Sequence, residues 1–451
     1  MEKLKLSEIA PYLGATYNKD AEFDSVCIDS RKITKGCLFI CIKGERFDAH
    51  QFADEALSLG ASAVMIHSDI EPNGAYIKVD DTAKAMLRLS GYYRSKFDIP
   101  VIGLTGSVGK TTTKEFTHLV VSAKYNAIKT LGNLNNEIGV PQMLFQIDNS
   151  TEAAVIEMGM NHFGEISRLV NEVKPTIGLI TNIGVSHIEN LGSREGILKA
   201  KLELCEGLAE GAPLILNGDN DMLQTVKDEH HKVVFYGIES GEFKAENIVE
   251  ADNSTSFDVA YYGKKQHITI PTIGIHNVYN ALAAFVVGYF LHIDPQLSAD
   301  AFADYVPAGM RQKVVDIDGI TSIEDCYNAS PDSMRAALKT LSDIKGNKKI
   351  AVLGDMLELG DYAKTAHTEV GTAVAENKID YLLAYGNDAK FYVDGAKQGG
   401  VENAFLFDDK EKLSEMLLNI ATRGDAVLFK GSRGMKLEDV INTVYKGWKK
   451  Q

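Results

Sequence analysis

Cysteine is scarce in this sequence, and its scarcity bears on where the protein works. The chain has five cysteines in 451 residues, an odd number, and none of them forms a CxxC pair. This pattern argues against a disulfide framework. The cysteines lie within apolar strand-like or helix-like runs, so we expect reduced core thiols in a cytoplasmic protein.

A long hydrophobic run is also missing. The longest apolar stretch covers residues 281–291, well short of the roughly 20 residues that a membrane-spanning helix needs. The N-terminus alternates charged and apolar residues and lacks the continuous apolar run of a secretory signal. We therefore expect no membrane span and no export.

Positive charge is in deficit. Lys and Arg number 47 against 62 Asp and Glu, which gives a net charge of −15. Such a balance argues against broad binding to nucleic acid or to an anionic membrane surface. Any anionic ligand must therefore meet donors that are concentrated locally.

The remaining composition is that of a globular protein, with 45% hydrophobic and 24% charged residues. At roughly 150 residues per domain, the length suggests about three domains. Short β-rich runs at 26–28, 37–42 and 63–66 alternate with helical patterns at 49–59 and after Asp81, which can cap the second helix. Pro100 disfavours helix in the residue before it, so we place a domain boundary there.

The pattern after residue 100 changes. Apolar, β-branched runs at 153–156 and 176–183 are typical of buried parallel strands, whereas residues 233–270 alternate with period two, as in antiparallel strands. Strand-helix alternation resumes at 350–353, 381–384 and 426–429. We predict a three-domain α/β fold: a small N-terminal α/β domain (1–98), a central P-loop domain with a doubly wound, mostly parallel sheet and an added antiparallel β region (99–309), and a C-terminal Rossmann-like domain (310–451).

Residues 101–113 read as a strand, a glycine-bearing turn and a helix start. Gly106 and Gly109 let backbone N–H groups approach phosphate oxygens, Lys110 can reach the β- and γ-phosphates, and Thr111 can ligate Mg²⁺. The strict P-loop motif fails at Leu104, which leaves the variant TGxxGKTT. An ordinary turn would also fit the glycines, but the strand and helix context favours an ATP site. Its candidate residues are Thr105, Gly106, Ser107, Val108, Gly109, Lys110, Thr111 and Thr112.

Two further residues follow predicted parallel strands. Glu157 ends the run at 153–157, where an acid points into the ligand crevice and can hold Mg²⁺, and His187 follows the next strand. The same pattern also fits a surface acid and a packed histidine. Lys201 lies in a helical pattern where lysines are normally solvated. Asn277 and Asn280 share a helix face and either bond a base or cap the helix.

Taken together, these motifs resemble the Mur ligases of peptidoglycan synthesis and their folylpolyglutamate synthetase relatives. The resemblance covers essentially the whole chain and runs, in the family's order, through TGSVGKTTTKE, NLNNEIGVPQ, EMGMNHFGEI, NIGVSHIENLGSREGILKAKLE, GIHNVYNA and GMRQ. The strings DCYNASPDSMRAAL, LGDMLELG and FKGSRGMKLE look like the type that adds D-alanyl-D-alanine to UDP-N-acetylmuramoyl-tripeptide. The DNPR-type motif of the diaminopimelate- or lysine-adding type is absent.

The resemblance implies an ATP- and Mg²⁺-dependent ligase, active as a monomer through an acyl phosphate. Lys110 and Thr111 would bind ATP phosphates and Mg²⁺, Glu157 and His187 would hold a second Mg²⁺, and Lys201 matches a lysine that becomes carbamylated and approaches that metal. The nucleotide would also meet Asn277, Asn280, Arg311, Asp325 and Lys430.

The same resemblance places the other substrates. Asp29, Ser30 and Arg31 would face the uridine diphosphate, and Asn135 and Asn136 the muramoyl-peptide. The expected dipeptide pocket would include Asn328, Ser330 and Ser333, although this type usually has asparagine where Ser330 stands.

Two other classes of function use a phosphate loop. A P-loop NTPase would hydrolyse ATP to drive a partner and would need no carboxylate substrate. A nucleotide-binding scaffold without chemistry is the third class, which the co-occurrence of the loop with Glu157 and His187 disfavours.

Overall fold

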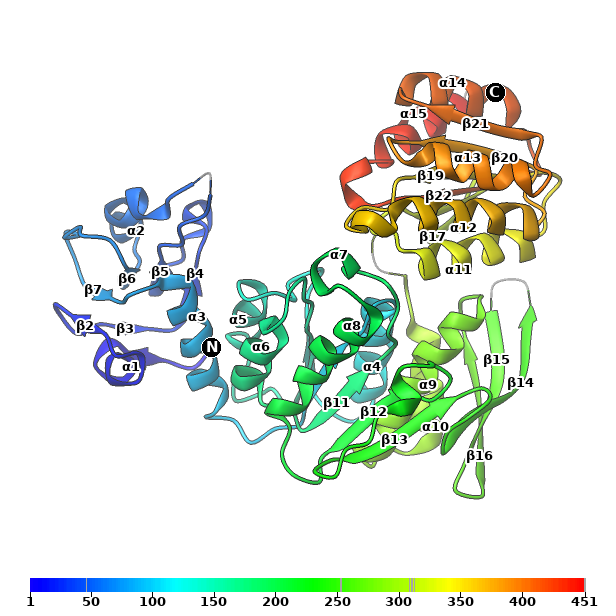
Figure 1. Ribbon diagram of the computed structural model, residues 1–451. Coiled ribbons are helices and arrows are strands. Elements are labelled where there is room, and N and C mark those ends of the chain that lie inside the picture. The colour runs from blue at the N-terminus through cyan, green and yellow to red at the C-terminus, as the bar shows by residue number, and fades with distance from the viewer. Residues whose placement is uncertain (46, 252–253, 308, 310, 312, 450–451) are drawn as a thin grey trace.

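The computed structural model describes residues 1–451 except 46, 252–253, 308, 310, 312 and 450–451. The chain forms three α/β lobes, and Figure 1 shows the central lobe between the N-terminal and C-terminal ones. Each lobe has its own mainly parallel sheet, which confirms the predicted fold class. Among the described residues, no helix has both the length and the apolar character that are needed to cross a bilayer.

The N-terminal lobe holds a five-stranded sheet of order β2-β7-β6-β5-β4 and a short β1-β3 pair. Asp81 accepts hydrogen bonds from the backbone N–H groups of Ala83 and Lys84 at the start of α3, so the predicted cap is confirmed. The predicted helix at 49–59 is a 3-10 turn followed by a short helix. The elements are β1 (Leu4–Lys5), α1 (Leu6–Leu13), β2 (Thr16–Tyr17), β3 (Glu22–Phe23), β4 (Ser25–Cys27), η1 (Ser30–Lys32), β5 (Cys37–Ile40), η2 (Ala49–Phe52), α2 (Ala53–Ser58), β6 (Ala63–Ile66), β7 (Tyr76–Lys78) and α3 (Thr82–Arg94).

The central lobe is built on a nine-stranded sheet of order β16-β15-β14-β13-β12-β11-β8-β10-β9. Strands β10 and β9 lie on one side of β8, and strands β11 to β16 lie on the other, as in a doubly wound sheet. Its strands are β8 (Val101–Thr105), β9 (Ala127–Lys129), β10 (Ala153–Glu157), β11 (Ile177–Ile180), β12 (Pro213–Asn217), β13 (Lys232–Gly237), β14 (Phe243–Ala251), β15 (Ser254–Tyr261) and β16 (Lys264–Ile270). Its helices are α4 (Lys110–Ser122), α5 (Gly139–Leu144), α6 (Glu165–Val173), α7 (Ile188–Leu191), α8 (Arg194–Leu202), η3 (Glu203–Gly207), η4 (Leu223–Thr225), α9 (Ile275–Phe290), α10 (Pro295–Ala301) and η5 (Phe302–Asp304).

The added β region begins later than the sequence pattern indicates. β13 pairs in parallel with both β12 and β14, so residues 233–237 belong to the parallel sheet. Only β14, β15 and β16 pair antiparallel, and β15 and β16 form the predicted hairpin around Gly263. Period-two alternation marks a half-buried strand but not its direction.

The C-terminal lobe is a six-stranded sheet of order β17-β18-β22-β19-β20-β21, in which only the edge strand β17 runs antiparallel to its neighbour. Helices cover both faces, as in a Rossmann-like fold. The elements are β17 (Lys313–Ile317), β18 (Ile320–Asp325), α11 (Pro331–Asp343), β19 (Lys349–Gly354), η6 (Gly360–Tyr362), α12 (Ala363–Glu376), β20 (Tyr381–Tyr385), α13 (Ala389–Gln398), β21 (Asn403–Phe407), α14 (Lys410–Ile420), β22 (Ala426–Lys430), η7 (Arg433–Met435) and α15 (Glu438–Trp448).

Apolar side chains cover both faces of the central sheet. Alternate residues of β8 point to opposite faces: Val101 joins the core formed with α3, α5 and α6, whereas Ile102 and Leu104 join the core formed with α4 and α9. The first core continues into the N-terminal lobe through Met86 and Leu89 of α3. With both faces covered, the carboxyl ends of the strands are where loops can gather polar side chains.

The segment that follows α8 depends on a close contact at Gly207. A Cβ added there would lie 2.6 Å from Val170 Cγ2 and closer still to the Val170 carbonyl oxygen. We predict that Gly207→Ala lowers the free energy of unfolding by about 1–3 kcal/mol through overpacking, although alanine is the better helix former. Urea denaturation measures the loss. In the control Gly44→Ala, the nearest atom would be the Phe47 carbonyl oxygen at 3.8 Å; equal losses in the two variants would contradict this account.

Candidate active site

The phosphate loop lies between β8 and α4, as the sequence predicts. Gly109 has φ of +82°, a conformation that L side chains rarely adopt, and a Cβ there would lie 2.6 Å from Asn280 Oδ1. A Cβ on Gly106 would collide with Thr181 Oγ1. Lys110 Nζ donates to the carbonyl oxygens of Gly106 (2.8 Å) and Ser107 (3.3 Å), so its ammonium lies directly over the loop.

The segment after β11 supports this loop from the side. Asn182 Oδ1 accepts the backbone N–H of Val108 at 2.8 Å, and Thr181 Oγ1 donates to the Val108 carbonyl oxygen at 2.6 Å. The backbone N–H of Gly184 donates to Ser107 Oγ at 2.9 Å. These bonds fix the loop shape before any phosphate arrives.

Glu157 stands at the carboxyl end of β10 and is 1% exposed. Its Oε2 accepts from Thr111 Oγ1 at 3.1 Å and its Oε1 accepts from Asn135 Nδ2 at 2.8 Å. The structure thus brings together two predicted metal ligands and one predicted substrate residue. Lys114 Nζ lies 3.8 Å from Glu157 Oε2 and offsets the charge.

Lys114 is a site residue that the sequence interpretation missed. Its side chain is fully buried, and its Nζ also lies 3.3 Å from Glu115 Oε1 and donates to the Gly132 carbonyl oxygen at 3.4 Å. A helical lysine is normally read as solvated. The sequence does hold a signal for its place in the site: Lys114 is four residues after Lys110, and residues at i and i+4 share a helix face.

His187 has φ of +63°, and its Nδ1 lies 2.8 Å from Glu358 Oε2 of the C-terminal lobe. Hydrogen bonding to His187 lowers the pKa of the Glu358 carboxyl below its ordinary value. Glu358 also has positive φ, at +63°. It belongs to the string LGDMLELG, which carries part of the family resemblance, but no role for the glutamate was predicted from the sequence.

Lys201 is 2% exposed on α8, so the expectation of a solvated lysine from helix position alone is wrong. No described residue offers its ammonium an ion pair. Burial, and then repulsion from Lys110, lower the pKa of Lys201 well below its ordinary value. Burial at this position therefore disfavours the charged form of the lysine.

A cavity of about 450 Å³ opens between the central and C-terminal lobes. The predicted residues that line it are Ser107, Val108, Gly109, Lys110, Thr111, Thr112, Asn135, Asn136, Glu157, His187, Asn280, Arg311, Asp325, Asn328, Ser330, Ser333 and Lys430. Seven predicted residues are not part of its lining: Asp29, Ser30, Arg31, Thr105, Gly106, Lys201 and Asn277. The string GMRQ is described only in part, because Met310 and Gln312 lie outside the described residues.

The two asparagines of α9 differ in their surroundings. Asn280 Oδ1 accepts from Thr113 Oγ1 at 3.0 Å and reaches the cavity, whereas Asn277 Nδ2 donates to the Ile273 carbonyl oxygen at 2.8 Å beside the helix start. Asn280 is therefore placed to meet a ligand, and Asn277 bonds locally at the helix start.

The C-terminal lobe contributes a buried ion pair between Lys430 Nζ and Asp325 Oδ2 at 2.6 Å. Arg311 lies over the Tyr327 ring, with its guanidinium carbon 4.1 Å from the ring centroid. Ser330 and Ser333 form a capping box at the start of α11, so part of their hydrogen-bonding capacity serves the helix.

The Asp29-Ser30-Arg31 turn belongs to the N-terminal lobe and does not line the cavity. Arg31 Nε and Nη2 donate to the two carboxylate oxygens of Asp29 at 2.9 and 2.8 Å. This pairing lowers the pKa of Asp29 to about 2. The turn is thus a separate charged feature of the surface.

Comparison with known proteins agrees with this architecture. The chain matches the families described as "Mur ligase family, catalytic domain" over residues 22–93, "Mur ligase middle domain" over 104–288, and "Mur ligase, glutamate ligase domain" over 310–433. It is 40% identical to the UDP-N-acetylmuramoyl-tripeptide–D-alanyl-D-alanine ligase of Bacillus subtilis, over 92% of each chain.

Solved structures give the same result. A crystal structure of MurF from Acinetobacter baumannii superposes with a TM-score of 0.93 at 30% identity and covers 99% of each chain. MurF from Thermotoga maritima in complex with ADP gives 0.86 at 27% identity, covering 94% of this chain and 98% of that one. The resemblance seen in the motifs is confirmed: the chain belongs to the Mur ligase family and, within it, to the MurF type.

Proposed function

We propose that this protein joins D-alanyl-D-alanine to UDP-N-acetylmuramoyl-tripeptide in an ATP-dependent reaction that passes through an acyl phosphate, in the cytoplasmic stage of peptidoglycan synthesis. The observation that carries the proposal is the shared cavity, where the phosphate loop and Glu157 of the central lobe face Asp325, Lys430 and the start of α11. A cavity between two lobes suits a reaction that joins substrates held by different domains.

The chemistry explains why positive charge gathers here. A carboxylate is a poor electrophile, so the γ-phosphate of ATP must be transferred to it before an amine can attack. Two unit charges about 4 Å apart repel by roughly 4 kcal/mol at an effective dielectric of 20. Lys110 over the loop offsets this repulsion. The dipeptide amine then attacks the acyl carbon, and phosphate leaves from the tetrahedral intermediate.

The donor atoms fit Mg²⁺. Thr111 and Glu157 present a hydroxyl and a carboxylate whose oxygens lie 3.1 Å apart, and oxygen donors are the ligands Mg²⁺ prefers. We propose that Thr111, Glu157, His187 and carbamylated Lys201 hold the metal ions. When bound, Mg²⁺ neutralises charge on the phosphates. Thr111 and Glu157 orient one another through this hydrogen bond.

The burial of Lys201 supports the proposed carbamylation, because the reaction needs the uncharged form of the amine. Its lone pair would attack the carbon of CO₂, and the amine proton would pass to solvent, leaving a carboxylate on the side chain. The ammonium form of the lysine could not take this step, because it has no lone pair to offer. Burial lowers the pKa of Lys201 and so shifts the side chain toward the uncharged form.

We also propose a division of labour among the three predicted domains. Residues 1–98, with Asp29, Ser30 and Arg31, would hold the uridine diphosphate, residues 99–309 the ATP, and residues 310–451 the dipeptide near Asn328, Ser330 and Ser333. The second boundary falls beside Met310, outside the described residues. We also propose that the protein acts as a monomer and that it works in the cytoplasm.

Phosphate release tests the function directly. We expect release from ATP to require both UDP-N-acetylmuramoyl-tripeptide and D-alanyl-D-alanine, because the acyl phosphate needs the first substrate and turnover the second. Replacing the dipeptide by diaminopimelate, lysine or glutamate should abolish turnover. Equal release without the muramoyl substrate would contradict the ligase and favour a P-loop NTPase.

Lys110 provides a test of the phosphate loop. Lys110→Ala should lower turnover by at least roughly 10²-fold, as the loss of a preorganised charge stabiliser does. Among the described residues, its ammonium donates hydrogen bonds only to loop carbonyl oxygens, so circular dichroism should show an unchanged fold. Turnover at the wild-type rate under saturating ATP would remove Lys110 from the site.

Lys201 provides a separate test. Lys201→Ala should be nearly inactive and partly rescued by a short added carboxylate such as acetate, which replaces the missing carbamate. The matched control is Lys199→Ala on the same helix, where the side chain is exposed and lies near the Phe163 ring. Normal activity of the Lys201 variant, or rescue equal in both variants, would count against the carbamate.

A further inference from the structure

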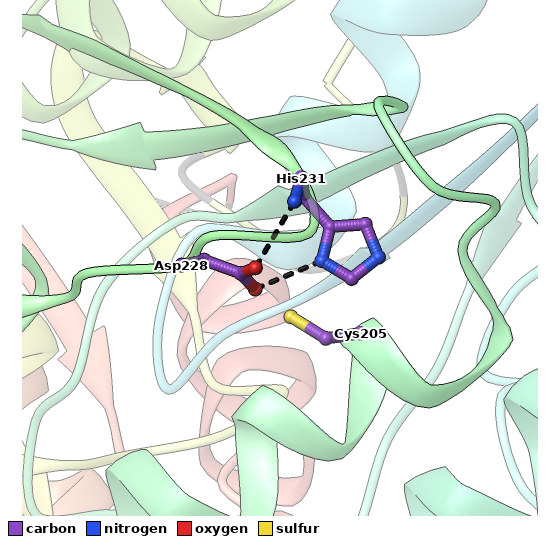
Figure 2. Close-up of side chains that lie close together, drawn as sticks. All are labelled: Cys205, Asp228 and His231. Atoms are coloured by element: carbon purple, nitrogen blue, oxygen red, sulfur yellow. Dashed lines mark hydrogen bonds and ion pairs between the residues drawn. The ribbon is translucent and has the colours of Figure 1, made fainter.

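A second cluster of metal-binding side chains lies away from the cavity. Cys205 is in η3, four residues after Lys201, and Asp228 and His231 lie in the loop that leads into β13. The ligand atoms of these three residues lie within 4.8 Å of one another (Figure 2). Among the described residues, these three are the Cys, His, Asp or Glu side chains whose ligand atoms form a group close enough together to hold a metal ion.

The Asp228 carboxylate is held in place by its own loop. Its Oδ1 accepts the backbone N–H groups of His230 at 2.8 Å and His231 at 3.0 Å, and its Oδ2 lies 2.8 Å from His231 Nδ1. Figure 2 shows the Cys205 sulfur directed toward this carboxylate and the imidazole. The side chains of His231 and Asp228 are only 8% and 16% exposed, so the three donors face a largely desolvated space.

The far side of the imidazole has a partner of its own. His231 Nε2 lies 3.5 Å from the Leu208 carbonyl oxygen, a long hydrogen bond in which the ring can only donate. A neutral ring that donates from Nε2 presents the Nδ1 lone pair to Asp228 Oδ2. In that tautomer the Nδ1 lone pair is available to a metal cation beside Asp228 Oδ2, whereas in the other tautomer Nδ1 donates to this carboxylate oxygen. A metal-bound histidine commonly donates its second N–H to a carbonyl oxygen in this way.

Cys205 has the properties of neither a reactive nor a disulfide-bonded cysteine. The half-buried Cys205 thiol faces the Asp228 carboxylate, and a negative neighbour disfavours the thiolate, so the free thiol is not a ready nucleophile. No disulfide joins any of the five cysteines, and the cluster contains only one of them. A metal cation reverses the electrostatics, because a coordinating thiol loses its proton.

We propose that Cys205, Asp228 and His231 bind a Zn²⁺-class divalent cation, with one coordination position left for water. Sulfur, imidazole nitrogen and carboxylate oxygen are the ligand types of tetrahedral zinc, and the thiolate selects against Mg²⁺ and Ca²⁺. The ion would link η3 to the loop before β13, one helical turn from Lys201. It would therefore stabilise the segment that carries the carbamylation site without taking part in the reaction.

Zinc titration of the full-length chain tests the site. The chelator-treated protein is titrated with Zn²⁺ in competition with a chromophoric chelator, and we expect one tight equivalent per chain. Cys205→Ser and His231→Gln should each weaken binding by at least about tenfold, since even loss of an outer-shell partner costs 10–100-fold. The matched controls are His230→Gln, at the exposed neighbouring histidine, and Cys27→Ser, at another half-buried thiol. Both controls should bind as the wild type does.

Co²⁺ substitution tests coordination by sulfur without relying on the variants. The wild-type protein should show a thiolate-to-cobalt charge-transfer band, and Zn²⁺ should raise the melting temperature of the wild type and the controls but not of His231→Gln. The proposal is wrong if the wild type lacks the charge-transfer band. It is equally wrong if Cys205→Ser and His231→Gln, once shown to be folded, bind Zn²⁺ as tightly as the controls.

Discussion

The site depends on a buried carboxylate. Removing an ion such as Glu157 from water costs several kcal/mol unless partners compensate. Thr111, Asn135 and Lys114 supply that compensation, and they come from the first turn of α4, the loop after β9 and the next turn of α4. Glu157 thereby holds β10, α4 and the loop after β9 in fixed relative positions at the carboxyl end of the sheet. The same acid is left in place to meet a metal ion and a triphosphate.

The C-terminal lobe reaches this arrangement through the segment after β11. A Cβ at Gly184 would collide with the Asp332 carboxylate, so glycine there permits the start of α11 to approach. Gly184 also donates to Ser107 of the phosphate loop, and three residues later His187 faces Glu358. The nucleotide loop and the third lobe therefore share one support. In the proposed reaction, this connection would bring the lobe proposed to hold the dipeptide close to the lobe proposed to activate the acyl group.

Local sequence patterns predicted much of this molecule. The phosphate loop, the cap at Asp81, the hairpin at Gly263 and the α/β class each rest on a short-range rule of turn chemistry or periodicity. Strand direction at β13, the burial of Lys201 and the role of Lys114 escaped those rules, because each depends on neighbours that are distant in sequence. The motif resemblance supplied the candidate residues that no periodicity marks, and the cavity gathers most of them; their individual roles stay predictions.

Central to the proposed function are Thr111 and Glu157, which would form the metal end of an ATP site beside the substrate acid. A crystal structure with a non-hydrolysable ATP analogue, Mg²⁺ and UDP-N-acetylmuramoyl-tripeptide tests this most directly. We predict phosphates on the loop at Lys110, with magnesium coordinated by Thr111 and Glu157, and His187 directed into the same cavity. Phosphates bound elsewhere, or Glu157 and His187 turned away from the metal, would contradict the claim.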